Sequence, residues 1–415
     1  MYKGEVSKSG AAILPSKRVR RIPDKTALSS KEKELGTEIY LISDEPYRKI
    51  IFDNKKYPFI FPHHDRSIVV TSHSKDLGLA GERIGYIALS PKDKDKQVLY
   101  DALVFSSGMA AICTTLLTFL SQGDRIVTTR NLYGGTIISL DQDFTRFGID
   151  VHYVDVKDLD AVETALKEKQ TKVLYCETVA NPLLEISDLP ALSKLAKKYG
   201  AIPIVDSTFA TPMACQPIEH GFDLVIHSVT KLLNGHSDIL GGTVAGHDEL
   251  INQIWYKLRN FGGTMDPHQA SLFERGMKTL HVRYEMAMNT ASKLASWLES
   301  HEKITKVIYP GLKSHNDYDL CKKIMSSPST MVCFEVEGGD DAGRKLMDNL
   351  EIAAQAVSLG GVESLISMPC STTHVSWKKE DRLAVGIGLG FIRFSTGLED
   401  AEDLISDFEQ ALEKI

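Results

Sequence analysis

Residues 223–242 read D-L-V-I-H-S-V-T-K-L-L-N-G-H-S-D-I-L-G-G, and we take this stretch as the centre of the fold. Its apolar start, residues 224–227, predicts a short buried strand, and a Gly-, Asn- and Ser-rich run follows Lys231. In open α/β sheets, ligands bind beyond the carboxyl ends of the strands. A lysine in that place can form a Schiff base with an aldehyde once its pKa falls below the ordinary value of about 10.4. A solvated loop lysine is the simpler interpretation of Lys231 taken alone, so the surrounding sequence has to decide.

The composition is that of an ordinary globular protein long enough for two domains. The 415 residues are 43% hydrophobic and 25% charged, with a net charge of −7. This acidic balance gives no support to a nucleic-acid or anionic-membrane partner, and the basic cluster at residues 17–21 is too short to change that. The six cysteines have no metal-ligand spacing, so we expect no metal site and a reducing compartment. No apolar run reaches the length of a membrane span or a signal segment, which favours the cytoplasm.

Apolar runs at regular spacing predict a doubly wound α/β fold with a mainly parallel sheet. Helical segments separate several of the predicted strands, which centre near Val104, Ile126, Val151, Val173, Ile204 and Val225. Beyond residue 269 we expect a long helix to about residue 299, strands at 306–309, 331–336 and 392–396, and a closing helix at 401–414. The sequence thus predicts four parts: a basic arm (1–33), a short segment (34–97), a large domain (98–270) and a smaller C-terminal α/β domain (271–415).

Polar and aromatic residues stand where the predicted strands end. The S-S-G-M run at residues 106–109 joins a strand to a helix, where backbone N–H groups can bind an anion. Tyr133 could stack on a flat ring, and a buried Asp206 needs a partner such as a protonated pyridine nitrogen. Arg393 has the geometry to bind an amino-acid carboxylate. Helix capping by the serines, core packing of Tyr133 and a surface position for Arg393 are the alternatives. Their joint placement favours an amino-acid site with an aldehyde cofactor.

From about residue 98 to its end, the chain resembles the Cys/Met-metabolism pyridoxal-phosphate enzymes. That family includes methionine γ-lyase, cystathionine γ-lyase, cystathionine γ-synthase and the homoserine-ester sulfhydrylases. The resemblance implies the fold-type I architecture and pyridoxal 5′-phosphate as cofactor. The matching motifs are F-S-S-G-M-A-A-I (105–112), Y-G-G-T (133–136), D-S-T-F-A-T-P (206–212), H-S-V-T-K-L-L-N-G-H-S-D (227–238), S-L-G-G-V-E-S-L (358–365) and I-R-F-S-T-G-L-E-D (392–400).

The resemblance also implies a role for each residue that matches a family motif. Lys231 would hold the cofactor through a Schiff base and, once released, shuttle protons between Cα and Cβ of the substrate. Tyr133 would stack on the cofactor ring and assist proton transfer, so Lys231 and Tyr133 are the expected catalytic residues. Asp206 would pair with the pyridine nitrogen and Asn181 would lie near the ring hydroxyl. The phosphate would be surrounded by Ser107, Gly108, Met109, Ser228 and Thr230, and the substrate carboxylate would bind Ser358 and Arg393.

The implied reaction is γ-elimination or γ-replacement on a sulfur- or oxygen-substituted amino acid, carried out by a homo-oligomer, either a dimer or a tetramer. Val357 stands just before S-L-G-G, where family members that handle cystathionine resemble each other in carrying an acidic residue. This favours methionine, homocysteine or an O-acylhomoserine as substrate. Gly135 replaces the cysteine that is typical of methionine γ-lyase. A cystathionine γ-lyase or γ-synthase therefore remains the alternative.

Residues 34–97 resemble part of a different family, the class I aminotransferases. The matching motifs are I-S-D-E-P-Y (42–47) and S-H-S-K-D-L-G-L-A-G-E-R-I-G-Y (72–86). This segment stands in place of the tyrosine and arginine by which the Cys/Met family reaches a neighbouring subunit's cofactor phosphate. Arg83 and Tyr86 are candidate substitutes, and without one we expect weaker cofactor binding. Two further alternatives follow from this segment: an aminotransferase that uses Lys75, and an inactive fusion.

Overall fold

The computed structural model describes residues 101–372, 380, 383 and 386–415, together with residue 33 and four short strands nearer the N-terminus. The chain forms two compact units, Met1–Tyr100 and Asp101–Ile415. In the first unit, β1 (Ala11–Ile13), β2 (Tyr40–Asp44), β3 (Ser67–Ser72) and β4 (Gly85–Leu89) form one sheet in that order. The β1–β2 and β2–β3 pairs are parallel and the β3–β4 pair is antiparallel. Lys75, Arg83 and the side chain of Tyr86 lie outside the described residues.

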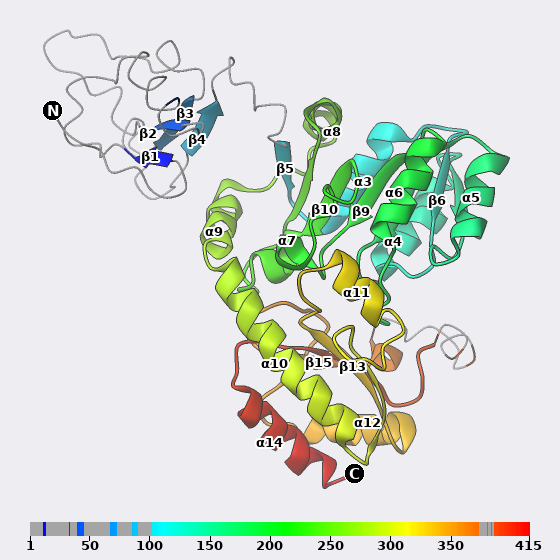
Figure 1. The fold of residues 1–415 in the computed structure, drawn as a ribbon, viewed down its shortest axis with the longest axis vertical. Helices are drawn as coiled ribbons and strands as arrows, with labels where there is room; N and C mark the ends of the chain where they lie inside the picture. The colour runs from blue at the N-terminus through cyan, green and yellow to red at the C-terminus, as the bar shows by residue number, and fades with distance from the viewer. Residues whose placement is uncertain are drawn as a thin grey trace, which may run out of the picture. The chain divides into compact units, whose positions relative to one another are not determined.

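A sheet covered by helices forms the centre of the second unit (Figure 1). It has seven strands in the order β5-β11-β10-β9-β8-β6-β7. Its strands are β5 (Asp101–Phe105), β6 (Arg125–Thr128), β7 (Asp150–Tyr153), β8 (Thr171–Glu177), β9 (Ile202–Asp206), β10 (Leu224–Ser228) and β11 (Gly242–Gly246). Neighbouring strands from β10 to β7 run parallel, whereas β11 is antiparallel to both of its neighbours. The predicted mainly parallel sheet is therefore confirmed. The sequence pattern missed β11 because a glycine stands at each end of its short T-V-A core.

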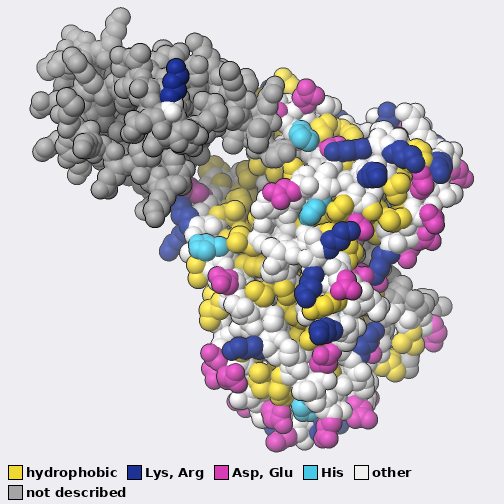
Figure 2. Space-filling view, in the orientation of Figure 1, with side chains coloured by type: hydrophobic (Ala, Val, Ile, Leu, Met, Phe, Trp, Pro, Cys, Tyr) yellow, Lys and Arg dark blue, Asp and Glu magenta, His cyan; other side chains and the backbone are white. Residues whose placement is uncertain are grey.

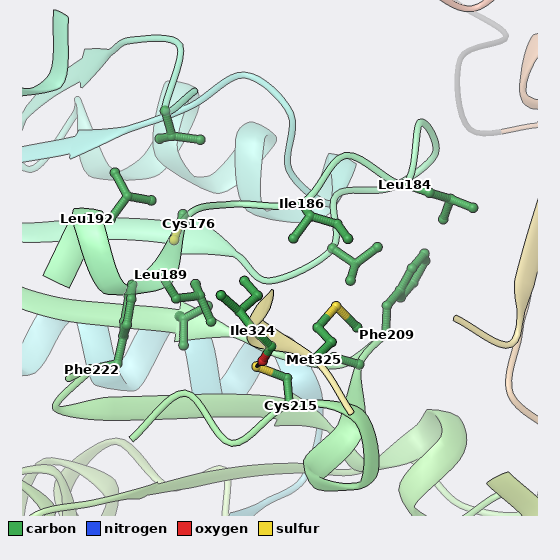
Figure 3. Packing of buried hydrophobic residues seen from close by; sticks show 14 of the residues in the cluster. Cys176, Leu184, Ile186, Leu189, Leu192, Phe209, Cys215, Phe222, Ile324 and Met325 are labelled. Atoms are coloured by element: carbon green, nitrogen blue, oxygen red, sulfur yellow. Dashed lines mark hydrogen bonds between the residues drawn. The ribbon is translucent and has the colours of Figure 1, made fainter. Parts of the chain in front are cut away.

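Helices cover both faces of this sheet because its strands are apolar on both sides. On β8, Val173 and Tyr175 pack into the cluster that contains α3 (Gly108–Phe119) and α8 (Asp248–Phe261). Leu174 and Cys176 point the other way, into the cluster that contains α5 (Leu159–Glu168) and α6 (Leu189–Lys198). Figure 3 shows Leu189 and Leu192 of α6 beside Cys176 in this second cluster. Burial on both faces is the pattern expected of a doubly wound parallel sheet.

A smaller sheet follows, with the strand order β12-β13-β16-β15-β14. Its strands are β12 (Ile304–Ile308), β13 (Met331–Val336), β14 (Ala354–Gln355), β15 (Leu365–Ser367) and β16 (Phe391–Ser395). Side chains of β13 alternate between two cores, as the two-residue period of a strand requires. Val332 and Phe334 pack with α10 (Leu280–Ser300), α12 (Gly339–Asn349) and α14 (Ala401–Leu412), whereas Met331 and Cys333 join the cluster of the larger sheet. The smaller sheet therefore packs one face toward the larger sheet's core.

Shorter elements complete the described fold, and one predicted helix is divided. The helix expected from residue 269 to 299 is two helices, α9 (Pro267–Met277) and α10, with Lys278 and Thr279 between them. Figure 1 shows α10 running beside α14 toward the C-terminus. The remaining elements are α4 (Gly134–Ile138), η2 (Ser139–Phe144), α7 (Thr211–Ala214), η3 (Val229–Leu233), α11 (Tyr318–Ile324) and η4 (Pro369–Ser371).

The described residues show no membrane-spanning helix, and the face in Figure 2 shows no patch of a single charge sign. No helix among the described residues is long and apolar enough to cross a membrane. Figure 2 shows acidic and basic side chains interspersed over the described part of this face. The same residues contain no cluster of three or more His, Cys, Asp or Glu side chains that could hold a metal ion.

Candidate active site

A cavity of about 350 Å³ is lined by residues at or after the ends of strands in the larger sheet, and by β16 and the loop after β14 in the smaller sheet. It brings together all the residues that the sequence analysis selected as site residues, although they span positions 107 to 393. Val357, which the sequence analysis considered for substrate choice, also lines it, as do Glu177 and Thr208. The selected residues in its wall are Ser107, Gly108, Met109, Tyr133, Asn181, Asp206, Ser228, Thr230, Lys231, Ser358 and Arg393.

The strand register explains why these side chains meet. Gly242 at the start of β11 pairs with both Phe105 and Ser228, so the carboxyl ends of β5 and β10 lie at the same edge of the sheet. On the other side of β10, the last residues of β8 and β9, Glu177 and Asp206, are direct partners. A side chain at position 242 would collide with the backbone, because its Cβ would lie 2.3 Å from the carbonyl oxygen of Ser107. Glycine at this position lets the α3 N-terminus approach β11 and β10.

The N-terminus of α3 is open to an anion. The Ser107 hydroxyl caps the helix, since its oxygen accepts a hydrogen bond from the Ala110 N–H at 3.0 Å. The N–H groups of Gly108 and Met109 belong to the first turn and have no intrahelical acceptor. The first turn contains no acidic residue, so the helix dipole adds to their attraction for an anion. Capping and anion binding are thus compatible at this helix end.

Ser228 and Thr230 flank this helix end, but their hydroxyls differ in how they are engaged. A Cβ at Gly108 would lie 3.1 Å from the Ser228 oxygen, a contact tight enough that Ser228 or the helix would have to shift, so glycine favours this close approach. Among the described residues the Ser228 hydroxyl has no hydrogen-bond partner. The Thr230 oxygen accepts from the Gly241 N–H at 3.0 Å and donates to the Gly241 carbonyl at 3.3 Å. To donate to a ligand, the Thr230 hydroxyl would have to give up its bond to the Gly241 carbonyl.

Lys231 extends into the cavity from the turn η3. Its amino nitrogen donates a hydrogen bond to the Ser358 hydroxyl at 3.1 Å. Burial, and secondly the positive charge of Arg393, lowers the pKa of Lys231 to about 8. A free amine is the nucleophilic form of lysine, so this environment supplies a reactive group close to neutral pH. The solvated-loop alternative for Lys231 does not hold.

Two buried carboxyl groups lie side by side at the ends of β8 and β9. One oxygen of Asp206 accepts hydrogen bonds from the Thr208 N–H at 2.9 Å and the Thr208 hydroxyl at 2.5 Å. Its second oxygen has no partner among the described residues. Burial raises the pKa of Asp206 to about 6. Burial and the charge of Asp206 together hold the pKa of Glu177 well above its ordinary value. A cation at the free oxygen of Asp206 would offset the cost of ionising it.

Glu177 also holds the backbone next to the aromatic residue of the site. Its carboxyl oxygen accepts from the Tyr133 N–H at 2.5 Å, at the start of α4. The Tyr133 side chain is 48% exposed and lines the cavity, so it is not a core residue. Its ring lies over Gly135, where a Cβ would be only 2.6 Å from the ring carbon Cε1. The exposed ring is free to stack on a flat ligand.

Arg393 is 5% exposed, which excludes the surface position considered from the sequence. Its Nη2 donates to the main-chain carbonyls of Val357 at 2.6 Å and Ser358 at 3.3 Å. Its Nη1 donates to the side-chain oxygen of Asn181 at 3.3 Å. A guanidinium has five N–H donors, so donors remain for a substrate carboxylate beside the Ser358 hydroxyl.

Sequence reasoning missed Thr208 and the apolar lining of the cavity. The Thr208 hydroxyl donates to Asp206 and accepts from the Ser228 N–H at 2.8 Å, so it links two adjacent strand ends. Its position two residues after a strand-ending aspartate is the only sequence signal for this role. The apolar lining gives no comparable signal because its residues are scattered along the chain: Ile112, Val179, Phe209, Leu240 and Leu359.

The residues present fit a phosphate-bearing pyridine aldehyde. The helix N-terminus suits the phosphate, the exposed tyrosine suits a flat ring, and the free carboxyl oxygen of Asp206 suits a protonated ring nitrogen. The amine of Lys231 suits the aldehyde. All four features open into the same cavity.

Comparisons with known proteins divide the chain near residue 98. Residues 98–413 match the family described as Cys/Met metabolism PLP-dependent enzyme. Residues 33–99 match a second family, aminotransferase class I and II. Both resemblances inferred from the sequence motifs are therefore confirmed.

Curated relatives and solved structures match the same large part of the chain. An L-methionine gamma-lyase of Fusobacterium nucleatum subsp. polymorphum is 47% identical over 317 residues, covering 76% of this chain and 80% of the relative. A cystathionine beta-lyase of Bacillus subtilis (strain 168) is 43% identical, covering 75% and 79%. Cystathionine gamma-lyase from Lactobacillus plantarum, solved with L-serine, has a TM-score of 0.72 at 37% identity, covering 76% of this chain and 82% of that chain. Cystathionine gamma synthase from Xanthomonas oryzae pv. oryzae, solved with aminoacrylate and cysteine, has a TM-score of 0.73 at 37% identity, covering 75% and 81%.

Proposed function

The chain belongs to the Cys/Met metabolism PLP-dependent enzymes, and on that premise we propose that its cavity binds pyridoxal phosphate at Lys231 and cleaves or exchanges the γ-substituent of an amino acid. Membership makes it a fold-type I, pyridoxal-phosphate-dependent enzyme of the carbon–sulfur lyase and γ-replacement class. Which residues carry out the reaction, and on which substrate, is our proposal. The observation that carries it is the single cavity in which Lys231, Asp206, Ser358 and Arg393 converge.

When bound, the cofactor supplies an electron-withdrawing ring that stabilises negative charge at the substrate Cα. The chain's own groups hold and protonate this ring system. The N–H groups of Gly108 and Met109 would hold the phosphate, together with the hydroxyls of Ser107, Ser228 and Thr230. Asp206, held by Thr208, would ionise to pair with a protonated ring nitrogen, and Asn181 would hold the ring hydroxyl.

The substrate carboxylate is bound by Arg393 and Ser358. The guanidinium is held in place by the carbonyl of Val357 and by Asn181, so its remaining N–H groups point in a fixed direction. An ion pair of this kind, largely removed from water, is strong and directional. It places the substrate Cα within reach of the amine of Lys231, because that amine already contacts Ser358 at 3.1 Å.

Proton transfer falls to Lys231 and Tyr133. With a pKa of about 8, Lys231 can accept the proton from Cα near neutral pH and, once it has passed that proton on, accept a second from Cβ, which lets the γ-substituent leave with its electron pair. Tyr133 lines the cavity with an exposed side chain, and we propose that its hydroxyl assists departure of the γ-substituent. The buried apolar side chains of Val179, Phe209 and Leu359 line the cavity and would keep water from the atoms beside them, which strengthens these interactions.

The lining of the cavity favours a substrate with an uncharged side chain. Its charged groups are Glu177, Asp206, Lys231 and Arg393, each of which already has a partner or a role in the proposal. Val357 lines the opening with an apolar side chain instead of an acid. Cystathionine carries a distal ammonium and carboxylate, whose desolvation this surface would not offset. We therefore propose methionine, homocysteine or an O-acylhomoserine as substrate.

We also propose that the enzyme is a homo-oligomer, a dimer or a tetramer, and acts in the cytoplasm. Large apolar side chains of α8 support the first point: Trp255, Tyr256 and Phe261 are all exposed in the single chain. Exposed aromatic groups of this size are typical of surfaces that are covered in an assembly. Sedimentation of the purified protein would measure the number of subunits.

Product analysis tests the proposed reaction. With methionine, γ-elimination should release methanethiol, ammonia and 2-oxobutanoate in equal amounts. With O-acetylhomoserine and a thiol, γ-replacement should release acetate without ammonia. A Lys231→Ala variant should lose both reactions, whereas Lys75→Ala should keep them. Amino transfer to an added keto acid, lost in Lys75→Ala, would contradict the proposal.

A further inference from the structure

Arg283 is a buried cation that binds only uncharged oxygen atoms. The residue is only 8% exposed, and its side chain makes four hydrogen bonds to other protein groups. Nη1 donates to the Leu232 carbonyl at 3.0 Å, and Nη2 donates to the carbonyls of Leu233 at 3.3 Å and Gly276 at 2.9 Å. Nε donates to the Thr279 hydroxyl at 3.1 Å. Among the described residues no carboxylate lies within ion-pair distance of this guanidinium.

Two of these acceptors belong to η3, the turn that carries Lys231. The carbonyls of Leu232 and Leu233 lie at the end of this wide turn, where helical backbone leaves its carbonyls unpaired. Lys231 itself has a non-helical backbone within the turn, with φ −94° and ψ −140°. Such a turn is not stabilised by regular helical bonds alone, so its shape depends on groups outside it. Arg283 provides two of the outside bonds.

Gly235 lies directly against the same guanidinium. Its φ is +71°, and a Cβ at this position would lie 1.7 Å from Nη1 of Arg283. Glycine is therefore required both by the backbone and by the space that Arg283 occupies. The Gly235 N–H in turn donates to the Lys231 carbonyl at 2.8 Å. Arg283, Gly235 and the Lys231 turn thus form one packed unit.

The other two acceptors lie at the junction of α9 and α10. Gly276 is in the last turn of α9, and Thr279 precedes α10, the helix that packs against the smaller sheet. The guanidinium therefore joins the Lys231 turn to the junction at which the predicted long helix is divided.

We propose that Arg283 is a positioning residue for Lys231: by holding the carbonyls of Leu232 and Leu233 it fixes the turn from which the lysine reaches Ser358. Without it the turn relaxes, the Lys231 amine moves from its buried place, and the lysine becomes a poorer nucleophile. The proposal rests on the proposed attachment of the cofactor at Lys231. It concerns a residue that touches neither cofactor nor substrate.

The test measures the reactivity of Lys231 in the cofactor-free protein. Pyridoxal phosphate is added at a series of pH values, borohydride traps the adduct after timed intervals, and the labelled peptide is quantified. In the unmodified protein the rate should rise with an apparent pKa near 8. In Arg283→Met this pKa should move up toward the ordinary lysine value of about 10.4, and the fraction of free amine near neutral pH should fall roughly tenfold each time the pKa rises by one. Arg283→Lys should lie between the two.

Tyr284→Phe is the matched control, because it removes a hydrogen bond to the Pro328 carbonyl, 2.7 Å long, from the next residue of α10. It should lower the melting temperature and leave the labelling profile of Lys231 unchanged. If Arg283→Met does not fold, Gly235→Ala replaces it, since its Cβ displaces the guanidinium. A folded Arg283 variant that labels Lys231 at the unmodified rate and pH profile would overturn the inference. Absence of label on Lys231 in the unmodified protein would overturn the proposed cofactor attachment as well.

Discussion

The amino nitrogen of Lys231 lies 3.1 Å from the hydroxyl oxygen of Ser358, although 127 positions separate the two residues in the sequence. Lys231 follows a strand of the larger sheet, and Ser358 lies in the loop that leads to β15 of the smaller sheet. The carbonyl of Ser358 in turn accepts a hydrogen bond from Arg393. One chain of contacts therefore joins the proposed nucleophile to the proposed carboxylate-binding group.

Ser358→Ala removes the hydroxyl that contacts the Lys231 amine and that we propose binds the substrate carboxylate, but it keeps the main-chain carbonyl that Arg393 contacts. Because a hydrogen bond to a charged group contributes about 1.5–3 kcal/mol, we expect kcat/KM for methionine to fall roughly ten- to a hundredfold. Cofactor content, measured by visible absorbance, should be unchanged because Ser358 holds substrate and not phosphate. Loss of cofactor with retained kcat/KM per bound cofactor would contradict this role.

Arg393→Lys keeps the positive charge but loses the fork that binds Val357, Ser358 and Asn181. A lysine cannot replace three directed hydrogen bonds and also bind a carboxylate, so KM should rise at least tenfold. Steady-state kinetics with methionine checks this. The competing result is an unchanged KM with a lower kcat, which would place the carboxylate elsewhere in the cavity.

Asp206→Asn tests the buried carboxyl group in the cofactor-free protein. The folded-state pKa of Asp206, about 6, lies above its ordinary 3.8, so the folded protein releases this proton less readily than the unfolded chain. The stability that protonated Asp206 contributes is fully present below pH 3.8 and is lost as pH rises through about 6. As pH rises through this window, the free energy of unfolding of Asp206→Asn should increase relative to that of the unmodified protein by on the order of 2–3 kcal/mol. Denaturant unfolding at several pH values measures it; a constant difference would contradict the shifted pKa.

Val357→Glu should change the choice of substrate. A carboxylate at the opening can pair with the distal ammonium of cystathionine, and one charge-assisted hydrogen bond corresponds to a tenfold or greater change in kcat/KM. Val357→Gln is the uncharged control and should not produce the same change. If the unmodified protein already prefers cystathionine to methionine by a wide margin, the specificity argument is wrong.

The sequence predicted the larger sheet well because its strands are apolar on both faces. The runs around Ile126, Val173, Ile204 and Val225 are long enough to stand out, and each strand ends near a polar residue of the site. The strand β11 was missed because the glycines at 242 and 246, which allow close approach of α3 and β10, hide its apolar centre. Close packing removed the very signal that a strand prediction uses.

The sequence predicted those residues of the candidate site whose side-chain type points to one kind of ligand group. A lysine after a strand, an aspartate at a strand end and an arginine within a strand point to specific partners, and the structure places Lys231, Asp206 and Arg393 around one cavity. Supporting contacts such as those of Thr208 and Arg283 depend on the fold. Threonine and arginine occur throughout the chain, and only the tertiary structure selects the one that bonds to Asp206 or to the Lys231 turn.

The most direct test of the central claim is to find which lysine binds the cofactor. The purified protein is incubated with pyridoxal phosphate, reduced with borohydride, digested and mapped by mass spectrometry, with Lys231→Ala and Lys75→Ala treated in parallel. We predict one cofactor per chain on the peptide that contains Lys231, absent from Lys231→Ala and retained in Lys75→Ala. Label on the peptide that contains Lys75, with none on Lys231, would contradict the account.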